Sequence, residues 1–264
     1  MPSLSRGATK PICLMGRLLK AGRIFYGIAM AGIGVLSMYY RVLPYIMSPP
    51  AHVRGPLLVV LANIFGALLI FTGTGIALNK QTRQLSLLLG WVLLAIGCFY
   101  CIPAVFTTDH HYLQFPEWEN AEKVLALAAG AFVLAGTIAG ERYLRLGAIL
   151  YALMILCFGI LHFAVAVEAS GYVPAWIPYH VFWMYFCGAA LFGSGLAIII
   201  RIKPGLAAAL LGTMILIWFV ILHMPRVLTA DANSLNSELA SAFLALAYGG
   251  TAFVIAGTAY RRNQ

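Results

Sequence analysis

Residues 99–109, FYCIPAVFTTD, and residues 221–231, ILHMPRVLTAD, are two copies of one sequence pattern, 122 positions apart. Both copies hold a proline, a valine, a threonine and an aspartate at the same spacing. They differ where the first has Cys101 and the second has His223. Each copy ends a long apolar stretch, so the pattern indicates that a whole structural unit occurs twice.

The composition is that of a membrane protein. Of the 264 residues 62% are hydrophobic and 9% are charged, with a mean hydropathy of +0.91, whereas a water-soluble domain has about a quarter of its residues charged. Backbone groups in lipid must pair within the chain, which favours helices about 20 residues long. We predict an all-α polytopic membrane protein with eight transmembrane helices, at residues 24–46, 57–78, 85–106, 123–140, 146–167, 176–200, 205–225 and 239–259.

The formal charge of +9 follows the membrane topology and does not indicate a nucleic-acid partner. Thirteen of the 17 basic residues lie on one side of the predicted spans. The other side has seven of the eight acids and only four basic residues, Arg41, Arg54, Lys123 and Arg226. This positive-inside bias predicts a multi-pass protein of the bacterial cytoplasmic (inner) membrane with both termini in the cytoplasm.

Further sequence matches support a tandem duplication. The matching blocks are RLLKAGRIFYGIAMAGIGVLS from Arg17 with RYLRLGAILYALMILCFGILH from Arg142, TGTGIAL from Thr72 with FGSGLAI from Phe192, and AFVLAGT from Ala131 with AFVIAGT from Ala252. We therefore predict two tandem parallel four-helix bundles, related by a pseudo-two-fold axis along the membrane normal. The predicted divisions are a cytoplasmic basic amphipathic segment at 1–23, a first unit at 24–140 and a second unit at 141–264.

Ionisable side chains recur near the outer ends of the four helices of the second unit. Buried ionisable groups in membrane helices tend to face the bundle interior and to pair. The candidate ligand or redox site consists of His162, His180, His223, Arg226, Glu238, Trp176 and Trp183. The alternative is that these side chains only satisfy one another at helix ends. No ligand spacing in the sequence enforces zinc or copper geometry, so we predict no metal site.

The first unit has different residues at the matching places, namely Ser37, Val60, Asn63 and Cys101. Cys98 and Cys101 form a Cys-x-x-Cys motif and are a candidate thiol pair. The alternative is two small buried hydrophobic residues. Both cysteines lie in the last turns of a predicted helix. Because the C-terminal end of a helix disfavours negative charge, we expect both thiols to be mostly unreactive.

Three segments of the second half, GILHF at 159–163, VPAWIPYHVFWMYFCGAALFGSGLAI at 173–198 and ILHMPRV at 221–227, together resemble the DoxX-like family of small four-helix membrane proteins. The resemblance covers about residues 142–259 and reaches the first half only through the internal repeat. Members often carry an acidic residue where this chain has Ala189 and Ala190. Some members are similar to membrane subunits of thiosulfate:quinone oxidoreductase, and others accompany oxidative-stress and sulfur-handling proteins.

The resemblance implies an integral membrane subunit or accessory of a quinone-linked or other redox process, with an outward-facing His/Glu site. A quinone is the candidate cofactor, and the candidate partners are the lipid bilayer and other membrane or redox proteins. Whether the chain is an enzyme stays open, and no catalytic residue is assigned. Two alternatives remain: a transporter or carrier of a small hydrophobic or anionic solute, and a non-catalytic membrane assembly partner.

The charge bias predicts the topology directly. A reporter enzyme that is active only in the periplasm should be inactive when fused after Gln264 and active when fused near Glu119, because the basic side of a membrane protein stays in the cytoplasm. Activity of the fusion after Gln264 would exclude an even number of spans with cytoplasmic termini.

Overall fold

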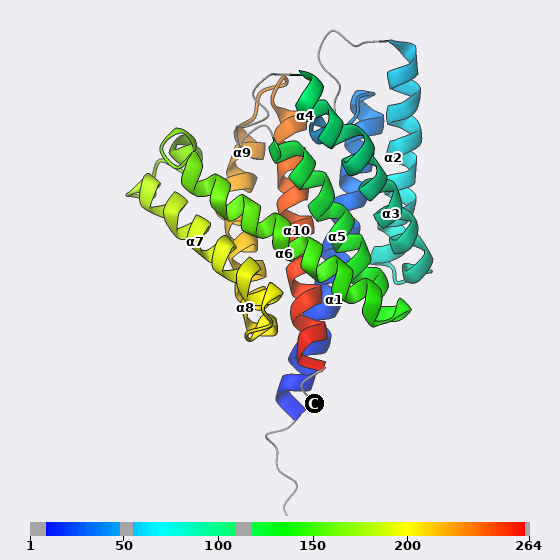
Figure 1. The fold of residues 1–264 in the computed structure, drawn as a ribbon. Coiled ribbons are helices and arrows are strands. Elements are labelled where there is room, and N and C mark those ends of the chain that lie inside the picture. The colour runs from blue at the N-terminus through cyan, green and yellow to red at the C-terminus, as the bar shows by residue number, and fades with distance from the viewer. Residues whose placement is uncertain (1–8, 48–54, 109–117, 262–264) are drawn as a thin grey trace, which may run out of the picture.

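The computed structural model describes residues 9–47, 55–108 and 118–261, and in this part of the chain every regular element is a helix (Figure 1). Eight helical segments are long and apolar enough to cross a membrane, which confirms the predicted number. The elements are α1 (Thr9–Tyr40), η1 (Tyr45–Met47), α2 (Pro56–Ala77), α3 (Thr82–Ile96), η2 (Gly97–Cys101), α4 (Ile102–Thr108), α5 (Glu119–Ala139), α6 (Glu141–Ala164), η4 (Glu168–Tyr172), α7 (His180–Ile199), α8 (Pro204–Trp218), η5 (Phe219–His223), α9 (Met224–Thr229) and α10 (Leu235–Arg261).

The first helix, α1, runs without a break from Thr9 to Tyr40. Gly257 of α10 lies against Leu19 of α1, so α10 contacts α1 on the N-terminal side of Arg23. The predicted cytoplasmic amphipathic segment at 1–23 stays a prediction. Residues 1–8 lie outside the described part of the chain.

The contacts between helices form one closed ring that includes α5 and α10, and these two helices also contact each other across it. α1 packs against α2 and α10, and α6 packs against α5 and α7. α3 packs against α5, α8 packs against α10, and α5 and α10 contact each other. Figure 1 shows α5 and α10 in the middle, with α2 and α3 on one side and α7 and α8 on the other.

Small residues let the two halves approach each other. A β-carbon at Gly22 of α1 would overlap the carbonyl oxygen of Gly250 in α10, and one at Gly147 of α6 would lie 2.8 Å from the carbonyl oxygen of Ala129 in α5. These two contacts occupy corresponding positions in the two matched sequences. Such close backbone approach drives helix association in lipid, where burial of apolar surface contributes little.

A buried tyrosine links α1 to α5, and another links α6 to α10. The hydroxyl of Tyr26 in α1 donates to the carbonyl of Leu127 in α5 at 2.6 Å. The hydroxyl of Tyr151 in α6 donates to the carbonyl of Tyr248 in α10 at 2.8 Å. Both tyrosine side chains are fully buried. The donors match in the sequence repeat, and so do the acceptors.

The repeated pattern that contains Cys101 and His223 forms a π-helical turn in both halves. α3 and α8 each have 15 residues and are followed by the five-residue π turns η2 and η5. In both, the N–H that closes the turn bonds to the carbonyl five residues earlier, from Ile102 to Gly97 and from Met224 to Phe219. The next residue is a proline, which has no N–H and needs space from the carbonyl four residues before it, so a wider turn accommodates it.

The sequence alignment of the second spans was wrong by two residues. A β-carbon at Gly73 would lie 2.6 Å from the carbonyl oxygen of Gly27, and one at Gly195 would lie 2.7 Å from that of Ala152. Gly73 therefore matches Gly195, and Thr72 does not match Phe192. In this register the positions that match His180 and Trp183 are Leu58 and Leu61, in place of Val60 and Asn63.

One glycine connects the two halves. α5 ends at Ala139 and α6 begins at Glu141, so Gly140 is the whole connection. Its φ of +109° lies in a region that side chains with a β-carbon rarely adopt. This conformation lets α6 turn back directly along α5.

The two tyrosine hydrogen bonds provide a stability test. Tyr26→Phe and Tyr151→Phe should each lower the free energy of unfolding by about 1 kcal/mol, because each leaves a buried carbonyl without its donor. Thermal unfolding in detergent measures the effect. The control is Tyr185→Phe, since the half-exposed Tyr185 ring stacks on Phe163 and Phe keeps that contact. A loss in one half only would contradict the equivalence of the two bonds.

Candidate functional site

Arg226 and Glu238, both in the predicted site, form an ion pair at the end of the bundle that carries α4 and α9. The Nε of Arg226 donates to Oε2 of Glu238 at 2.8 Å, and Nη2 donates to Oε1. This two-bond geometry is the stronger form of an arginine–carboxylate pair. The guanidinium also lies over the ring of Tyr172, with 4.7 Å from Cζ to the ring centroid. The pair therefore joins η4, α9 and α10.

The turn between α9 and α10 is shaped by Asp231. Its Oδ1 accepts hydrogen bonds from the backbone N–H groups of Asn233 and Ser234 and from the Ser234 hydroxyl. These bonds, first of all the one from the Ser234 side chain, lower the pKa of Asp231 below its usual value. The turn sets the direction in which α10 begins, and so brings Glu238 to Arg226.

His223 is half-buried beside this ion pair, with its Nδ1 atom enclosed. Its Nδ1 makes no hydrogen bond within the described part of the chain, and its charged neighbours are Glu238, Arg226 and Lys123. In the first half, Cys101 occupies the matching place in the other π turn. The Cys101 thiol is buried and faces the carbonyl of Ile46 at 3.9 Å. The same backbone feature thus presents an imidazole in one half and a thiol in the other.

The two remaining histidines of the predicted site make different contacts. Nδ1 of His162 donates to the carbonyl of Phe158, one turn earlier in α6, at 2.7 Å. Its charged neighbour is Glu119 of α5. His180 is half-buried at the first position of α7. In residues 9–47, 55–108 and 118–261, no group of three or more His, Cys, Asp or Glu side chains is placed to hold a metal ion.

Polar residues in the first turn of α5 were not among the predicted site residues. Lys123 Nζ lies 2.5 Å from Oε1 of Glu119 and 5.1 Å from the ring centroid of Tyr45. The carbonyl of Lys123 accepts a hydrogen bond of 3.2 Å from the Tyr248 hydroxyl. Glu122, on the same turn, is only 7% exposed. The predicted span began at residue 123, which placed the acids in a loop, although α5 begins at Glu119.

The candidate thiol pair lies in the π turn of the first half. Cys98 is exposed, Cys101 is buried, and both are free thiols. Their different exposure means that a reagent from outside the bundle meets Cys98 first. The expected low reactivity of the pair stays a prediction.

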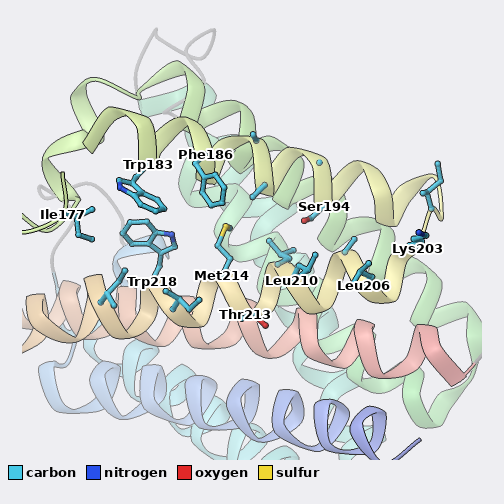
Figure 2. Close-up of a pocket in the computed structure, with 18 of the residues that line it drawn as sticks. Ile177, Trp183, Phe186, Ser194, Lys203, Leu206, Leu210, Thr213, Met214 and Trp218 are labelled. Atoms are coloured by element: carbon cyan, nitrogen blue, oxygen red, sulfur yellow. The ribbon is translucent and has the colours of Figure 1, made fainter. Parts of the chain in front are cut away.

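A large apolar groove runs between α7 and α8 (Figure 2). We call it the α7–α8 groove, and its volume is about 1010 Å³. Trp183 and Trp218 meet edge to face at one end, with 6.1 Å between ring centroids, and Lys203 lies at the other end. Trp176, which is 71% exposed, also lines the groove. Both tryptophans of the predicted site thus belong to the groove, whereas the Arg226–Glu238 pair does not line it.

The groove exists because α7 and α8 each pack on a different helix. Gly188 of α7 lies against Gly159 of α6, and Gly212 of α8 lies against Phe253 of α10. Small residues on α7 that line the groove, among them Gly193, leave the space between the two helices open. At the position in the first half that matches Gly193, the chain has the exposed Phe71.

Comparisons with protein-family models, with curated proteins and with solved structures find no match for this chain. The class of protein is therefore defined by the fold itself. Over residues 9–47, 55–108 and 118–261 the chain is all-helical, with eight helices long and apolar enough to cross a membrane.

The Arg226–Glu238 pair gives a prediction for stability. Arg226→Gln and Glu238→Gln should each destabilise the protein, and the double variant should lose less than the sum of the two. We expect a coupling free energy of about 1 kcal/mol, because the Arg226 side chain is 35% exposed and solvent screens part of the attraction. Thermal unfolding of the four proteins measures this coupling, with the exposed Arg201→Gln as a control. Additive losses would show that the pair contributes no stability.

Proposed function

We propose that the chain is a DoxX-like protein of two fused four-helix units, a subunit or accessory of a quinone-linked redox process in the bacterial inner membrane, with both termini cytoplasmic. The observation that carries this proposal is the α7–α8 groove. The paired tyrosine bonds, glycine contacts and π turns support the division into two units.

The size and lining of the groove suit a quinone with an isoprenoid tail. Pockets for small molecules hold roughly 300–1,000 Å³, so this groove suits a ligand of lipid size. Its wall is almost entirely apolar, and wall residues such as Leu210 and Ile217 are more than half exposed in the region that lipid surrounds. A long apolar tail can therefore enter sideways from the bilayer without crossing a polar barrier.

The tryptophan end of the groove suits the quinone ring. Trp183 and Trp218 offer flat apolar surfaces on which an aromatic or quinonoid ring stacks. The indole N–H of Trp183 donates to the Pro178 carbonyl at 3.2 Å, which fixes the orientation of its ring. Trp183 therefore contributes stacking. The imidazole of His180 lies close in the sequence to these lining residues and is the proposed hydrogen-bond donor to a quinone carbonyl.

A carrier for a small solute is the second candidate. The matched π turns η2 and η5 interrupt corresponding spans, and paired interruptions of this kind occur in transporters built from repeats. Reconstituted vesicles separate the two functions. A carrier moves solute across a sealed bilayer, whereas a quinone-binding subunit binds quinone without any flux.

Filling the groove should abolish quinone binding. A β-carbon at Gly193 meets no atom within 4 Å, so Gly193→Trp should fill the groove and leave the fold intact. Quenching of tryptophan fluorescence by a short-tailed quinone measures binding. We expect Kd to rise at least about tenfold, or about 1.4 kcal/mol.

The matched control is Leu196→Trp, which places an indole on the same helix at an exposed position that does not line the groove. This variant should bind quinone as the unmodified protein does. Equal binding by Gly193→Trp and Leu196→Trp would contradict a quinone site in the groove.

A further inference from the structure

Glu122 carries a buried carboxyl group. It lies in the first turn of α5 with an exposed fraction of 7%. Its Oε2 makes no hydrogen bond within the described part of the chain. Ionisable groups buried inside a membrane protein are costly and normally pair, so a buried carboxyl group with an unpaired oxygen suggests a function.

The nearest cation is already engaged elsewhere. Lys123 follows Glu122 directly, but its ammonium group pairs with Glu119 at 2.5 Å and lies over the ring of Tyr45. Glu119 is the nearest anion, and it lies one helical turn before Glu122. An ionised Glu122 would therefore put a second negative charge beside Glu119 while the only adjacent ammonium is shared with that residue.

Among the described residues, no cation other than Lys123 acts on Glu122 from the helices packed against this part of α5. Cys157 of α6 is the neighbouring titratable group on that helix, and α10 contributes the Tyr248 hydroxyl, which donates to the Lys123 carbonyl. His162 of α6 lies near Glu119, and its Nδ1 is committed to the Phe158 carbonyl. Only the neutral acid form of Glu122 avoids an uncompensated buried charge in these surroundings.

We propose that Glu122 is a proton-binding site between the two halves, which holds a proton at neutral pH and exchanges it with water at the α4/α9 end of the bundle. The route for exchange is Glu119, whose side chain is 44% exposed and lies one turn closer to that end. The ligand class is the proton alone, and binding converts the carboxylate to a carboxylic acid. The site is distinct from the α7–α8 groove, so a test of proton binding at Glu122 does not depend on whether the groove binds quinone.

Infrared spectroscopy of the protein in lipid tests the proposal. At neutral pH the intact protein should show a carboxylic-acid carbonyl band, which disappears as the pH rises and is lost in Glu122→Gln. The matched control is Glu238→Gln, which removes a carboxylate paired with Arg226 and should leave the band unchanged. A band that is absent from the intact protein, or that persists in Glu122→Gln, would overturn the proposal.

A second measurement uses the unaltered chain and does not depend on the folding of a variant. A hydrophobic carbodiimide adds the O–H of a carboxylic acid across one of its C=N bonds, and the O-acylisourea so formed rearranges to a stable N-acylurea. Peptide mass analysis should place this adduct on Glu122, with less at high pH, where the acid is ionised. Labelling of Glu119 or Glu238 without labelling of Glu122 would show that Glu122 holds no proton.

Discussion

The close backbone contact of α1 with α10, and of α6 with α5, is the constraint on which the rest of the structure depends. In lipid there is little apolar surface to remove from water, so helices associate through packing at small residues such as Gly22 and Gly147. These contacts place α5 and α10 at the centre of the molecule. Glu122, in the first turn of α5, is therefore buried. The peripheral α7 and α8 are free to diverge, which opens the groove.

The spans could be predicted from the sequence because hydropathy and length are one-dimensional signals. The register of the second span could not, because apolar sequence of low complexity aligns almost equally well at neighbouring offsets. Its register is determined by the contacts of Gly73 and Gly195 with the preceding helix. The start of α5 was missed for a related reason. Hydropathy places charged residues outside a span, whereas protein contacts bury Glu122 inside one.

In the candidate site, the position of a residue along its helix could be predicted from the sequence, whereas the direction in which its side chain points could not. The level of a residue along the membrane can be read from the sequence, and this placed His223, Arg226 and Glu238 near the same end of the bundle. The direction in which a side chain points around its helix depends on the neighbours of that helix. His162 therefore bonds to its own helix, and Trp183 lines a groove with Trp218. The groove could not be predicted, because it depends on how α7 and α8 pack on different neighbouring helices and on small residues of α7 such as Gly193 that leave space between them.

The single glycine between α5 and α6 has a consequence for how the chain is connected. α1 packs on α10 as α6 packs on α5, and Figure 1 shows the first and last helices projecting together from one end of the bundle. One junction between the halves is covalent, at Gly140, and the other is made by packing alone. The contacts of the fold do not depend on which junction carries the peptide bond. A circularly permuted chain, opened at Gly140 and joined between the present ends of α10 and α1, would keep the same set of helix contacts.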